Sequence, residues 1–293
     1  MKDPRHFQII ALTALLFFGW ADGAFGFAPF HFGAIVATAF LAQALGSLLN
    51  AVRIDFKSPL ITALSLTLLL RADAAWPLAL AAAIAIGSKF TLRLNGKHIF
   101  NPANIGIVAT VLLADAAWTT PGQWGTALWF AALLAGAGFF ITYRAARIDM
   151  PVIFLGVYAT LLFARALWLG DPFSIPLLRL ENGALILFAF FMISDPKTTP
   201  DGAWARTGFA TATAVLAYVF SYHFYLDDGL FYALALTTLA RPAMELFDPA
   251  PLYQWGDAVK PPAWISRVAR LRRRSGKPAA QALITPFTGG RPQ

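Results

Sequence analysis

The chain contains no cysteine and little charge. Of its 293 residues, 13% are Asp, Glu, Lys or Arg, whereas 58% are hydrophobic. The absence of cysteine excludes disulfides, thiolate-bound iron–sulfur clusters and cysteine-ligated zinc on this chain. Soluble domains usually carry about 25% charged residues. Because no globular core can hide this much apolar surface, the composition predicts an integral membrane protein.

The sequence also lacks the short motifs of several enzyme classes. It has no Walker phosphate loop and no dinucleotide-binding glycine pattern, which argues against ATP-driven and Rossmann-type mechanisms. Its four histidines lack metal-ligand spacing, so we predict no metal site. No group of side chains indicates a catalytic centre. We therefore predict no catalytic residue, and the sequence leaves open whether the chain is an enzyme. The histidines are His6, His31, His98 and His223.

Ten apolar stretches, separated by Pro, Gly and clustered charges, predict an all-α fold of about ten transmembrane helices. The intervening loops alternate between lysine- and arginine-bearing loops and aspartate-bearing loops, with Arg71, Arg165 and Arg179 as exceptions. Because positive charge is retained in the cytoplasm, this alternation predicts a bacterial-type inner-membrane protein with both termini cytoplasmic. The stretches are 7–20, 30–49, 59–70, 76–90, 103–114, 125–142, 151–168, 182–193, 206–221 and 228–240.

Residues 1–240 are expected to form one transmembrane domain, and residues 241–293 a basic cytoplasmic tail. Behind a membrane domain, such a tail is expected to contact anionic lipid headgroups or a protein partner, or to hold the terminus inside. We do not expect it to bind nucleic acid. Its basic residues include Arg267, Arg270, Arg272, Arg273, Arg274 and Lys277.

Two of the ten stretches, 59–70 and 182–193, are too short to cross a bilayer as helices. About 12 helical residues reach only about 18 Å, whereas the hydrocarbon core is about 30 Å thick. Each is the third member of a group of five stretches and is followed by a polar break. This pairing predicts two inverted five-helix repeats, about 7–114 and 125–240, with broken helices 3 and 8. The alternative is a tilted bundle that contains two ordinary short helices.

A polar motif from Asn95 to Gly106 opens the fifth stretch. Asn101 followed by Pro102 is typical of a helix start, where free N–H groups favour an anionic or carbonyl-rich ligand. Asn101 and Asn104 are three residues apart, so both amides can face one side of the helix. Gly106 allows a backbone or a ring to approach closely. Helix-start chemistry alone explains this motif equally well.

A second polar motif, Ser194 to Gly202, follows the eighth stretch. Asp195 before Pro196 again indicates a helix start. Lys197 and three hydroxyls beside a half-length helix exceed what a cap requires, and they suit a phosphate, a ribityl chain or a flavin edge. An ordinary polar loop is the alternative. The hydroxyls belong to Ser194, Thr198 and Thr199.

A third polar spot, Tyr225 to Gly229, precedes the last stretch. In the predicted repeat it corresponds to the Asn–Pro turn on the opposite membrane face. Paired acids at a membrane edge can bind a cation, but we expect Asp227 and Asp228 to cap the helix and remain hydrated.

Together these motifs resemble the NqrB/RnfD family, the ten-helix membrane subunits of the sodium-pumping NADH:quinone reductase and the Rnf electron-transport complex. The resemblance covers most of residues 30–250 and implies a fold related to urea-transporter-like inverted repeats. The matching pieces, in order, are Lys57–Lys89, Gly96–Gly106, Phe191–Thr198 and Tyr225–Gly229 with the apolar run that follows.

The resemblance also implies flavins. Family members carry FMN esterified to a threonine of a Ser-Gly-Ala-Thr-like motif between helices five and six. This chain has Thr119 and Thr120 there without the motif, so we expect no covalent FMN. Sodium-pump relatives also hold a noncovalent riboflavin near the Asn–Pro turn, which by this match implies His98 and Asn101 here. The stand-alone, UnbU-like branch of the family is the better match.

Three functions are consistent with these features. The first is an electron-transport membrane subunit that holds a noncovalent flavin (riboflavin or FMN) or a quinone between the broken helices, within a redox complex and among membrane lipids. The second is a small-solute transporter or channel on the same scaffold. The third is an accessory membrane scaffold. The candidate cofactor-binding residues are His98, Asn101, Asn104, Gly106, Asp195, Lys197, Thr198 and Thr199.

Overall fold

The computed structural model describes residues 3–21, 28–120 and 128–254, and these fold mostly into helices. They belong to one compact unit, Met1–Ala258. The rest of the chain, Val259–Gln293, forms a second unit outside the described residues. Most of the predicted basic tail, 241–293, therefore lies beyond the part that the structure describes, including its basic residues from Arg267 to Lys277.

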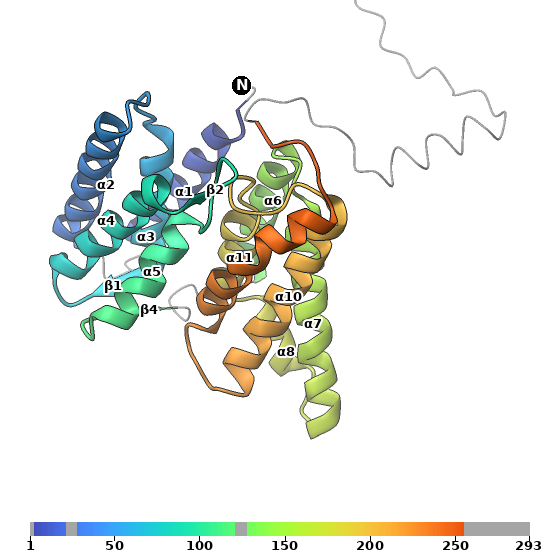
Figure 1. Ribbon diagram of the computed structural model, residues 1–293. Coiled ribbons are helices and arrows are strands. Elements are labelled where there is room, and N and C mark those ends of the chain that lie inside the picture. Colours follow the sequence, from blue (N-terminus) through green and yellow to red (C-terminus); the bar gives the residue numbers. More distant parts are fainter. Residues whose placement is uncertain (1–2, 22–27, 121–127, 255–293) are drawn as a thin grey trace, which may run out of the picture. The chain divides into compact units, whose positions relative to one another are not determined.

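The first half of this unit contains helices α1 to α5 (Figure 1), and each coincides with a predicted apolar stretch. α3 is short, as expected. It continues into strand β1, which pairs antiparallel with β4 beyond α5. The elements are α1 (Arg5–Ala21), α2 (Pro29–Leu49), α3 (Lys57–Leu69), β1 (Leu70–Ala72), α4 (Ala75–Thr91), β2 (Arg93–Leu94), β3 (Lys97–His98), α5 (Pro102–Leu113) and β4 (Ala117–Thr119).

The second half likewise follows the predicted stretches, with one addition and one extension. A short helix, α8, precedes the predicted eighth helix, which is itself part α-helix (α9) and part π-helix (η2). α11 continues past the predicted domain end at 240, because Pro242 lies inside the helix instead of ending it. The elements are α6 (Leu128–Arg144), α7 (Asp149–Leu169), α8 (Ser174–Leu180), α9 (Gly183–Leu187), η2 (Phe188–Met192), α10 (Ala203–Tyr222) and α11 (Gly229–Phe247).

By length and apolar composition, two described helices, α2 and α7, are sufficient to cross a bilayer unaided. The α8 helix and the α9–η2 segment make a third span if this pair, bent by 50°, counts as one. The apolar helices α1, α3, α4, α5 and α6 are shorter than a full span. The helices α10 and α11 have 20 and 19 residues but are less apolar. For α3, an extended strand follows directly: its 13 residues and the 3 of β1 together reach about 30 Å. The strand pair also supplies the backbone hydrogen bonds that a lipid environment cannot.

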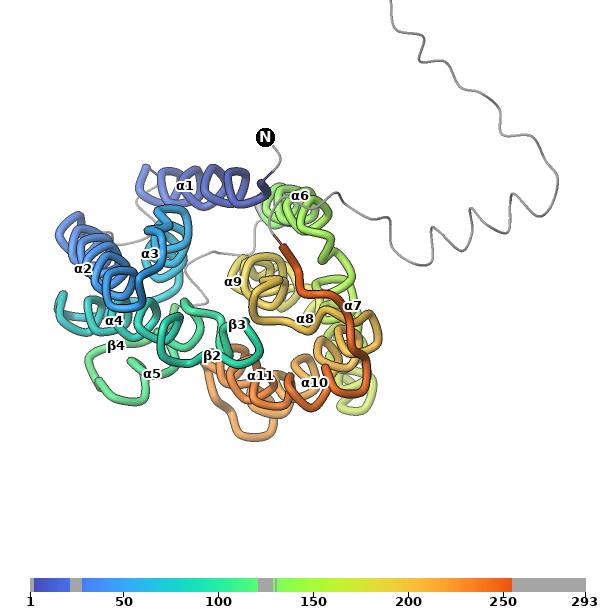
Figure 2. The backbone as a smooth tube through the Cα atoms, turned by 45° about the horizontal axis from the view of Figure 1, so that its top comes forward, coloured from blue at the N-terminus to red at the C-terminus, as the bar shows by residue number. Residues whose placement is uncertain are grey.

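The helices of the two halves pack in matching pairs. In the first half α1 packs on α3, α2 on α4, and α4 on α5. In the second half α6 packs on α9, α7 on α10, and α10 on α11. Figure 2 shows these as two adjacent groups of helices, which touch where α1 meets α6 and α5 meets α11. α3 and α9–η2 therefore hold equivalent places in their groups.

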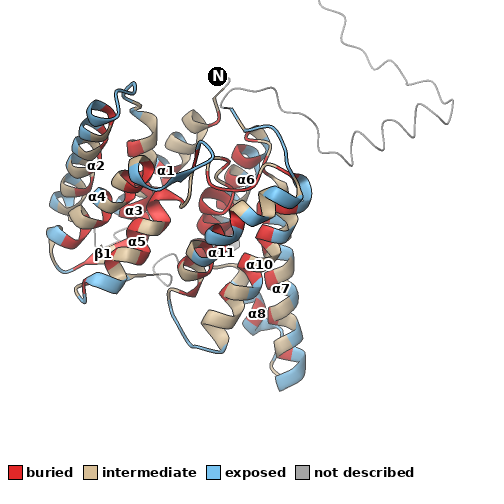
Figure 3. Ribbon diagram, viewed as in Figure 1, coloured by how far each residue is buried: buried red, intermediate tan, exposed pale blue. Residues whose placement is uncertain are grey.

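The core is centred on these short helices. Every residue of α9 and η2 is buried, and so are Leu66 and Leu68 of α3. Phe188 of η2 packs at a tilt against Phe154 of α7, with ring centroids 5.3 Å apart, and meets Phe231 of α11 edge-on at 6.0 Å. Outer helices such as α2 and α7 present exposed apolar residues (Figure 3), as expected for a lipid-facing surface.

Candidate functional site

A cavity of about 420 Å³ lies between the two halves, beside α3 and η2. Its walls come from α1, α2, α3, α4 and α6, from the start of α5, and from η2 with the turn after it. One part of the wall is apolar and aromatic and includes Phe190 and Phe191. The other part is polar and consists of Gln43, Asp55, Ser58, Thr62, Ser65, Lys89, Arg93, His98, Asn101, Thr142, Ser194, Asp195 and Lys197, with Arg5 and Gln8 of α1.

Asn101 joins the two predicted motifs across this cavity. It caps α5, because its side-chain oxygen accepts the Asn104 backbone N–H at 3.1 Å, and Pro102 takes the first helical position. Its amide nitrogen faces the other motif and donates to Met192 O and to Asp195 Oδ2, each at 3.4 Å. Both bonds are long, so this buried donor is available to a better-placed acceptor.

Asp195 organises the turn that follows η2. Its Oδ1 accepts the Lys197 backbone N–H at 3.0 Å. Its carbonyl accepts the hydroxyls of Thr198 and Thr199 at 3.3 and 2.9 Å. The carboxyl lies deep in the fold and keeps only partial exposure through the cavity. Loss of hydration raises the pKa of Asp195, while the backbone N–H and the charges of Lys197 and Lys97 oppose this shift.

His98 lines the same cavity with a neutral ring. Burial lowers the pKa of His98 to about 4, and the nearby positive charges of Lys89 and Arg93 lower it further. The buried Nδ1 of His98 has no hydrogen-bond partner among the described residues. At neutral pH the ring can therefore offer hydrogen bonding to a ligand without adding charge.

A two-residue hairpin turn between β2 and β3 places His98 at the cavity wall. Asn95 and Gly96 both have positive φ, 53° and 77°, between the short paired strands β2 and β3. Asn-Gly is the preferred sequence for such a hairpin turn. Successive strand residues point to opposite sides, so Lys97 is directed away from the cavity that His98 lines. The Asn-Gly dipeptide was a signal for this hairpin that the sequence interpretation did not use.

Four of the eight predicted residues line the cavity and four do not. The lining residues are His98, Asn101, Asp195 and Lys197. The other four have packing roles. Asn104 donates to Phe231 O at 3.1 Å and so ties α5 to α11. A Cβ at Gly106 would lie 2.6 Å from Ala81 O, so glycine is required where α5 meets α4. The buried Thr198 and Thr199 bond to the Asp195 carbonyl.

Sequence interpretation missed Lys89, whose side chain is buried with only 6% of the residue exposed. Lys89 lies in the last turn of α4, near the end of the predicted stretch 76–90. Its ammonium donates to Gln43 Oε1 at 2.7 Å, and Gln43 donates to Ser47 Oγ at 3.0 Å. An ionisable residue inside an apolar stretch is by itself a signal of a functional site. Lys89 and Gln43 both line the cavity.

A second polar group, the ion cluster, was also missed; it consists of Lys97, Arg147, Asp201 and Glu245. The ammonium of Lys97 lies 2.8 Å from Asp201 Oδ2 and 3.1 Å from Glu245 Oε1. Arg147 Nη2 lies 2.6 Å from Asp201 Oδ1. Lys97 also donates to the Thr199 carbonyl. These bonds join β3, the α6–α7 turn, the segment before α10 and the end of α11.

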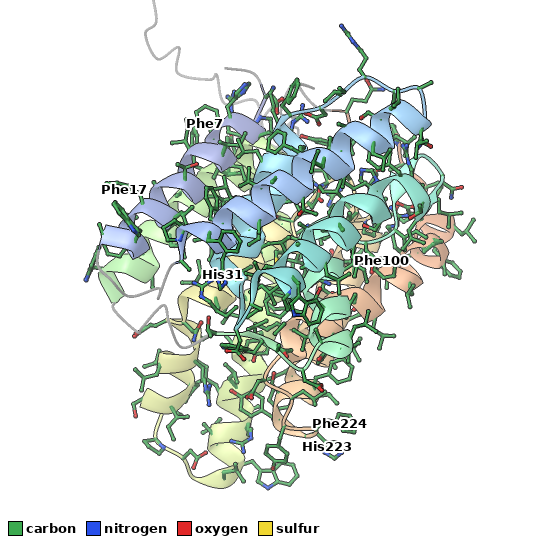
Figure 4. All side chains as sticks on the ribbon, turned by 90° about the vertical axis from the view of Figure 1, so that its left-hand side faces the viewer. Phe7, Phe17, His31, Phe100, His223 and Phe224 are labelled. Carbon is green, nitrogen blue, oxygen red and sulfur yellow. The ribbon has the colours of Figure 1, made fainter. Side chains whose placement is uncertain are left out.

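The third polar spot shows no cation site. Asp228 accepts a hydrogen bond from the Thr119 hydroxyl, which ties the start of α11 to β4. Within residues 3–21, 28–120 and 128–254, no group of three His, Asp or Glu side chains is suited to a metal ion. Figure 4 shows His31, in α2, well apart from His223, which follows the end of α10. Residues 121–127, which follow Thr120 and include part of the predicted connection between the fifth and sixth stretches, lie outside the described residues.

The cavity fits a planar ring with carbonyl edges. Its volume, about 420 Å³, lies within the range of about 300–1,000 Å³ common for small-molecule pockets. Phe190 and Phe191 supply apolar wall, while Asn101 and His98 supply one amide donor and one imidazole. Such a combination of a mostly apolar wall with a few polar groups is typical of cofactor sites.

Comparison with known proteins shows that residues 112–251 match the family described as "NQR2, RnfD, RnfE family", which confirms the predicted resemblance. A subunit of the ion-translocating oxidoreductase complex of Salmonella enteritidis PT4 (strain P125109) is 31% identical over 144 residues. The same-named protein of Citrobacter koseri is 30% identical over 145 residues. Each match covers 48% of this chain and only 38% of the relative. The family match includes Asp195 and Lys197. It begins at residue 112 and therefore does not include His98 or Asn101.

Proposed function

We propose that this chain, whose residues 112–251 match the NQR2, RnfD, RnfE family, is a membrane subunit of an ion-translocating electron-transport complex. We further propose that it holds a noncovalent flavin or a quinone in the cavity. The bound ring would supply the redox chemistry, and the protein would supply position and electrostatics. The relatives are named as subunits of such complexes, and the redox-complex partners of this chain are proposed on that basis.

One observation carries the proposal. The two polar motifs, nearly a hundred residues apart, face one cavity, where the Asn101 amide bridges to Met192 O and Asp195 Oδ2. Neither motif needs the other for helix capping, since Asn101 caps α5 and Asp195 orders its own turn. Helix-start chemistry alone does not explain why both motifs line one cavity that is large enough for a ligand and has polar and apolar walls.

The cavity residues have distinct proposed roles. The Asn101 amide would donate to a ring carbonyl, replacing its two long hydrogen bonds. The neutral His98 imidazole would contact the edge of the ligand's ring system from the cavity wall. Phe190 and Phe191 would pack against the apolar part of the ligand. Asn104, Gly106, Thr198 and Thr199 would act indirectly, by positioning these groups.

The finer architecture is part of the same proposal. The matching helix pairs of the two halves support two five-helix repeats, and the equivalent places of α3 and α9–η2 support their roles as broken helices. Ten spans with an inverted second half remain proposed on this basis. Arg5, Lys89, Arg93 and Lys197 all line the cavity, so the positive-inside rule favours an opening at the cytoplasmic side.

The transporter alternative requires a polar path through the protein. The second pocket, about 30 Å³ beside His31 and Arg71, shares no lining residue with the cavity. Along α3, the buried Leu66 separates Ser65, which lines the cavity, from Thr67, which lines the second pocket. This arrangement favours a closed site over a conducting path, and therefore a bound ring over a transported solute.

Purification in mild detergent tests the proposal. We expect the protein to carry flavin absorbance or an extractable quinone, and to rebind flavin after its removal. Acid precipitation should release all flavin into the supernatant, because no covalent attachment is expected. An Asn101→Leu variant should lose the ligand, whereas Arg165→Gln, far from the cavity residues in sequence and absent from its lining, should retain it. A protein that neither carries nor rebinds a flavin or quinone would contradict the proposed function.

A further inference from the structure

We propose that the cavity selects a ligand with an anionic phosphate attached to its ring system, that is, FMN in preference to riboflavin or a neutral quinone. This inference rests on the proposed function and names the charge of its ligand. It follows from three positively charged side chains, the cavity cations, defined as Lys89, Arg93 and Lys197. All three line the cavity.

The cavity cations have only neutral partners among the described residues. Lys89 donates to the Gln43 amide oxygen at 2.7 Å. Arg93 makes one long bond, 3.4 Å, to the Gly96 carbonyl. Lys197 donates to the Tyr253 carbonyl at 2.9 Å. The fourth cation at the wall, Arg5, differs because Asp3 and Asp55 each lie 2.8 Å from its guanidinium.

The acids of the cavity wall, Asp55 and Asp195, are outnumbered by its four cations, and neither acid forms an ion pair with a cavity cation among the described residues. Asp55 is committed to Arg5. Asp195 accepts the Asn101 amide and the Lys197 backbone N–H, and it forms no ion pair within 4 Å among the described residues. The wall thus presents an excess of positive charge to whatever occupies the cavity.

Excess charge of this kind has a physical cost when it is shielded from water. A neutral ring in the cavity would displace water from the cations without replacing the hydrogen bonds that this water makes. A phosphate would instead accept charge-assisted hydrogen bonds, for which arginine and lysine are the preferred donors. Lys89 is buried in the last turn of α4, whereas Arg93, in β2 just after this helix, is exposed, so the two cations lie at different depths of the cavity wall.

The cavity also has an apolar part of its wall, which contains no charged side chain. Gly138 of α6 allows Phe190 to approach closely, since a Cβ there would lie 2.5 Å from the Phe190 ring. Phe190, Phe191 and Ile141 form an apolar surface for a ring. A ligand with a planar apolar body and a terminal phosphate matches both parts, whereas riboflavin matches only one. A phospholipid headgroup shares the phosphate chemistry but would bring acyl chains instead of a ring.

Equilibrium titration of the flavin-free protein with FMN and with riboflavin tests this inference. We expect FMN to bind at least about tenfold more tightly, as judged by quenching of flavin fluorescence. Raising the salt from about 0.05 M to about 0.5 M should reduce the preference, because screening weakens charge attraction. The double variant Arg93→Gln with Lys197→Gln should lower FMN affinity more than riboflavin affinity and bring the ratio close to one.

Lys57→Gln is the matched control. Lys57 is a partly exposed cation paired with Asp3, and it does not line the cavity. The variant should therefore keep the FMN preference of the wild type. Equal affinities for FMN and riboflavin would overturn the inference and leave the proposed function intact. Failure of both flavins and of a quinone to bind would instead overturn the proposed function.

Two further titrations identify the source of the phosphate. Inorganic phosphate should compete weakly with FMN and hardly at all with riboflavin. Micelles that contain phosphatidylglycerol should leave the FMN affinity unchanged. If phosphatidylglycerol displaces FMN while riboflavin and FMN bind alike, the cations serve a lipid headgroup and the inference is wrong.

Discussion

Two buried lysines in this protein have similar exposure and opposite surroundings. Lys97 is 3% exposed and Lys89 is 6% exposed. Lys97 forms ion pairs with two carboxylates of the ion cluster, whereas Lys89 donates to an amide oxygen at the cavity wall and forms no ion pair among the described residues. Burial therefore does not separate a structural cation from a binding one; the charge of its partners does. A cation that is compensated within the fold has a structural role, and one left uncompensated beside a cavity has charge available for a ligand.

The hairpin β2–β3 keeps these two environments apart. Lys97 and His98 are neighbours in β3, and alternation along the strand directs one to the ion cluster and the other to the cavity. A shift of one residue in this hairpin would exchange the two side chains. The Asn-Gly turn fixes that register, because both of its residues need positive φ.

The largest effect is expected from breaking the ion cluster. Lys97→Met would leave Glu245 without its cation and Asp201 with only Arg147. Loss of one partner from a buried pair costs about 3–5 kcal/mol. Lys89→Met should lower the free energy of unfolding by about 1 kcal/mol or less, because no carboxylate loses a partner. Denaturant unfolding in detergent micelles measures the free energy of unfolding of both variants. Equal losses of stability in Lys97→Met and Lys89→Met would contradict the distinction between a compensated and an uncompensated lysine.

A smaller effect is expected at the contact that holds α5 in place. Gly106→Ala adds a Cβ that would lie 2.6 Å from Ala81 O, so it should cost about 1–3 kcal/mol of stability and weaken flavin binding by displacing Asn101. Gly87→Ala is the control, since nothing lies within 4 Å of its Cβ. That variant should be neutral or stabilised by up to about 1 kcal/mol. Flavin titration and unfolding of both variants measure the difference.

A change confined to the cavity should affect binding with little effect on stability. Asn101→Ser keeps a capping oxygen for α5 but removes the amide donor. We expect stability to change by about 0.5 kcal/mol or less and flavin affinity to fall several-fold, up to about tenfold. In Asn104→Ser the cap is intact and the bond to Phe231 O is lost, so stability should fall more than affinity. The opposite order for these two variants would contradict their assigned roles.

The smallest effect is expected from the pH dependence of stability. The pKa of His98 is lowered from 6.5 to about 4 in the folded protein. Between these values the unfolded chain binds more protons, so this contribution is fully present above about pH 6.5 and is lost as the pH falls towards about 4. The stability difference between the wild type and His98→Gln should therefore shrink or change sign over that range. A difference independent of pH would show that the ring is not held neutral by burial.

Much of the fold was predictable because hydropathy is local. Each of the ten apolar stretches coincides with a helix, and the shortness of α3 and α9–η2 followed from counting residues. The extra helix α8 and the continuation of α11 through Pro242 were not predicted. Both depend on packing: Arg241 and Pro242 resemble a helix end in sequence, yet Arg241 is completely buried within the unit.

Part of the candidate site was also predictable, because helix capping and polar turns are local features of the sequence. Polar residues beside short helices identified His98, Asn101, Asp195 and Lys197, which line the cavity. Asn104, Gly106, Thr198 and Thr199 belong to the same motifs, but their side chains serve helix contacts and a turn. A motif states which residues are near one another along the chain and not which way each side chain points.

Composition and charge pattern were thus sufficient for a helical membrane protein, for the order of its helices and for the two motifs. These features depend on the free energy of transfer into lipid and on local capping, both of which short segments express by themselves. Only the tertiary structure decided which cations have carboxylate partners and which face the cavity, because ion pairing joins residues such as Lys97 and Asp201 across more than a hundred positions. The proposed site lies where that pairing leaves Lys89, Arg93 and Lys197 without an ion-paired carboxylate among the described residues.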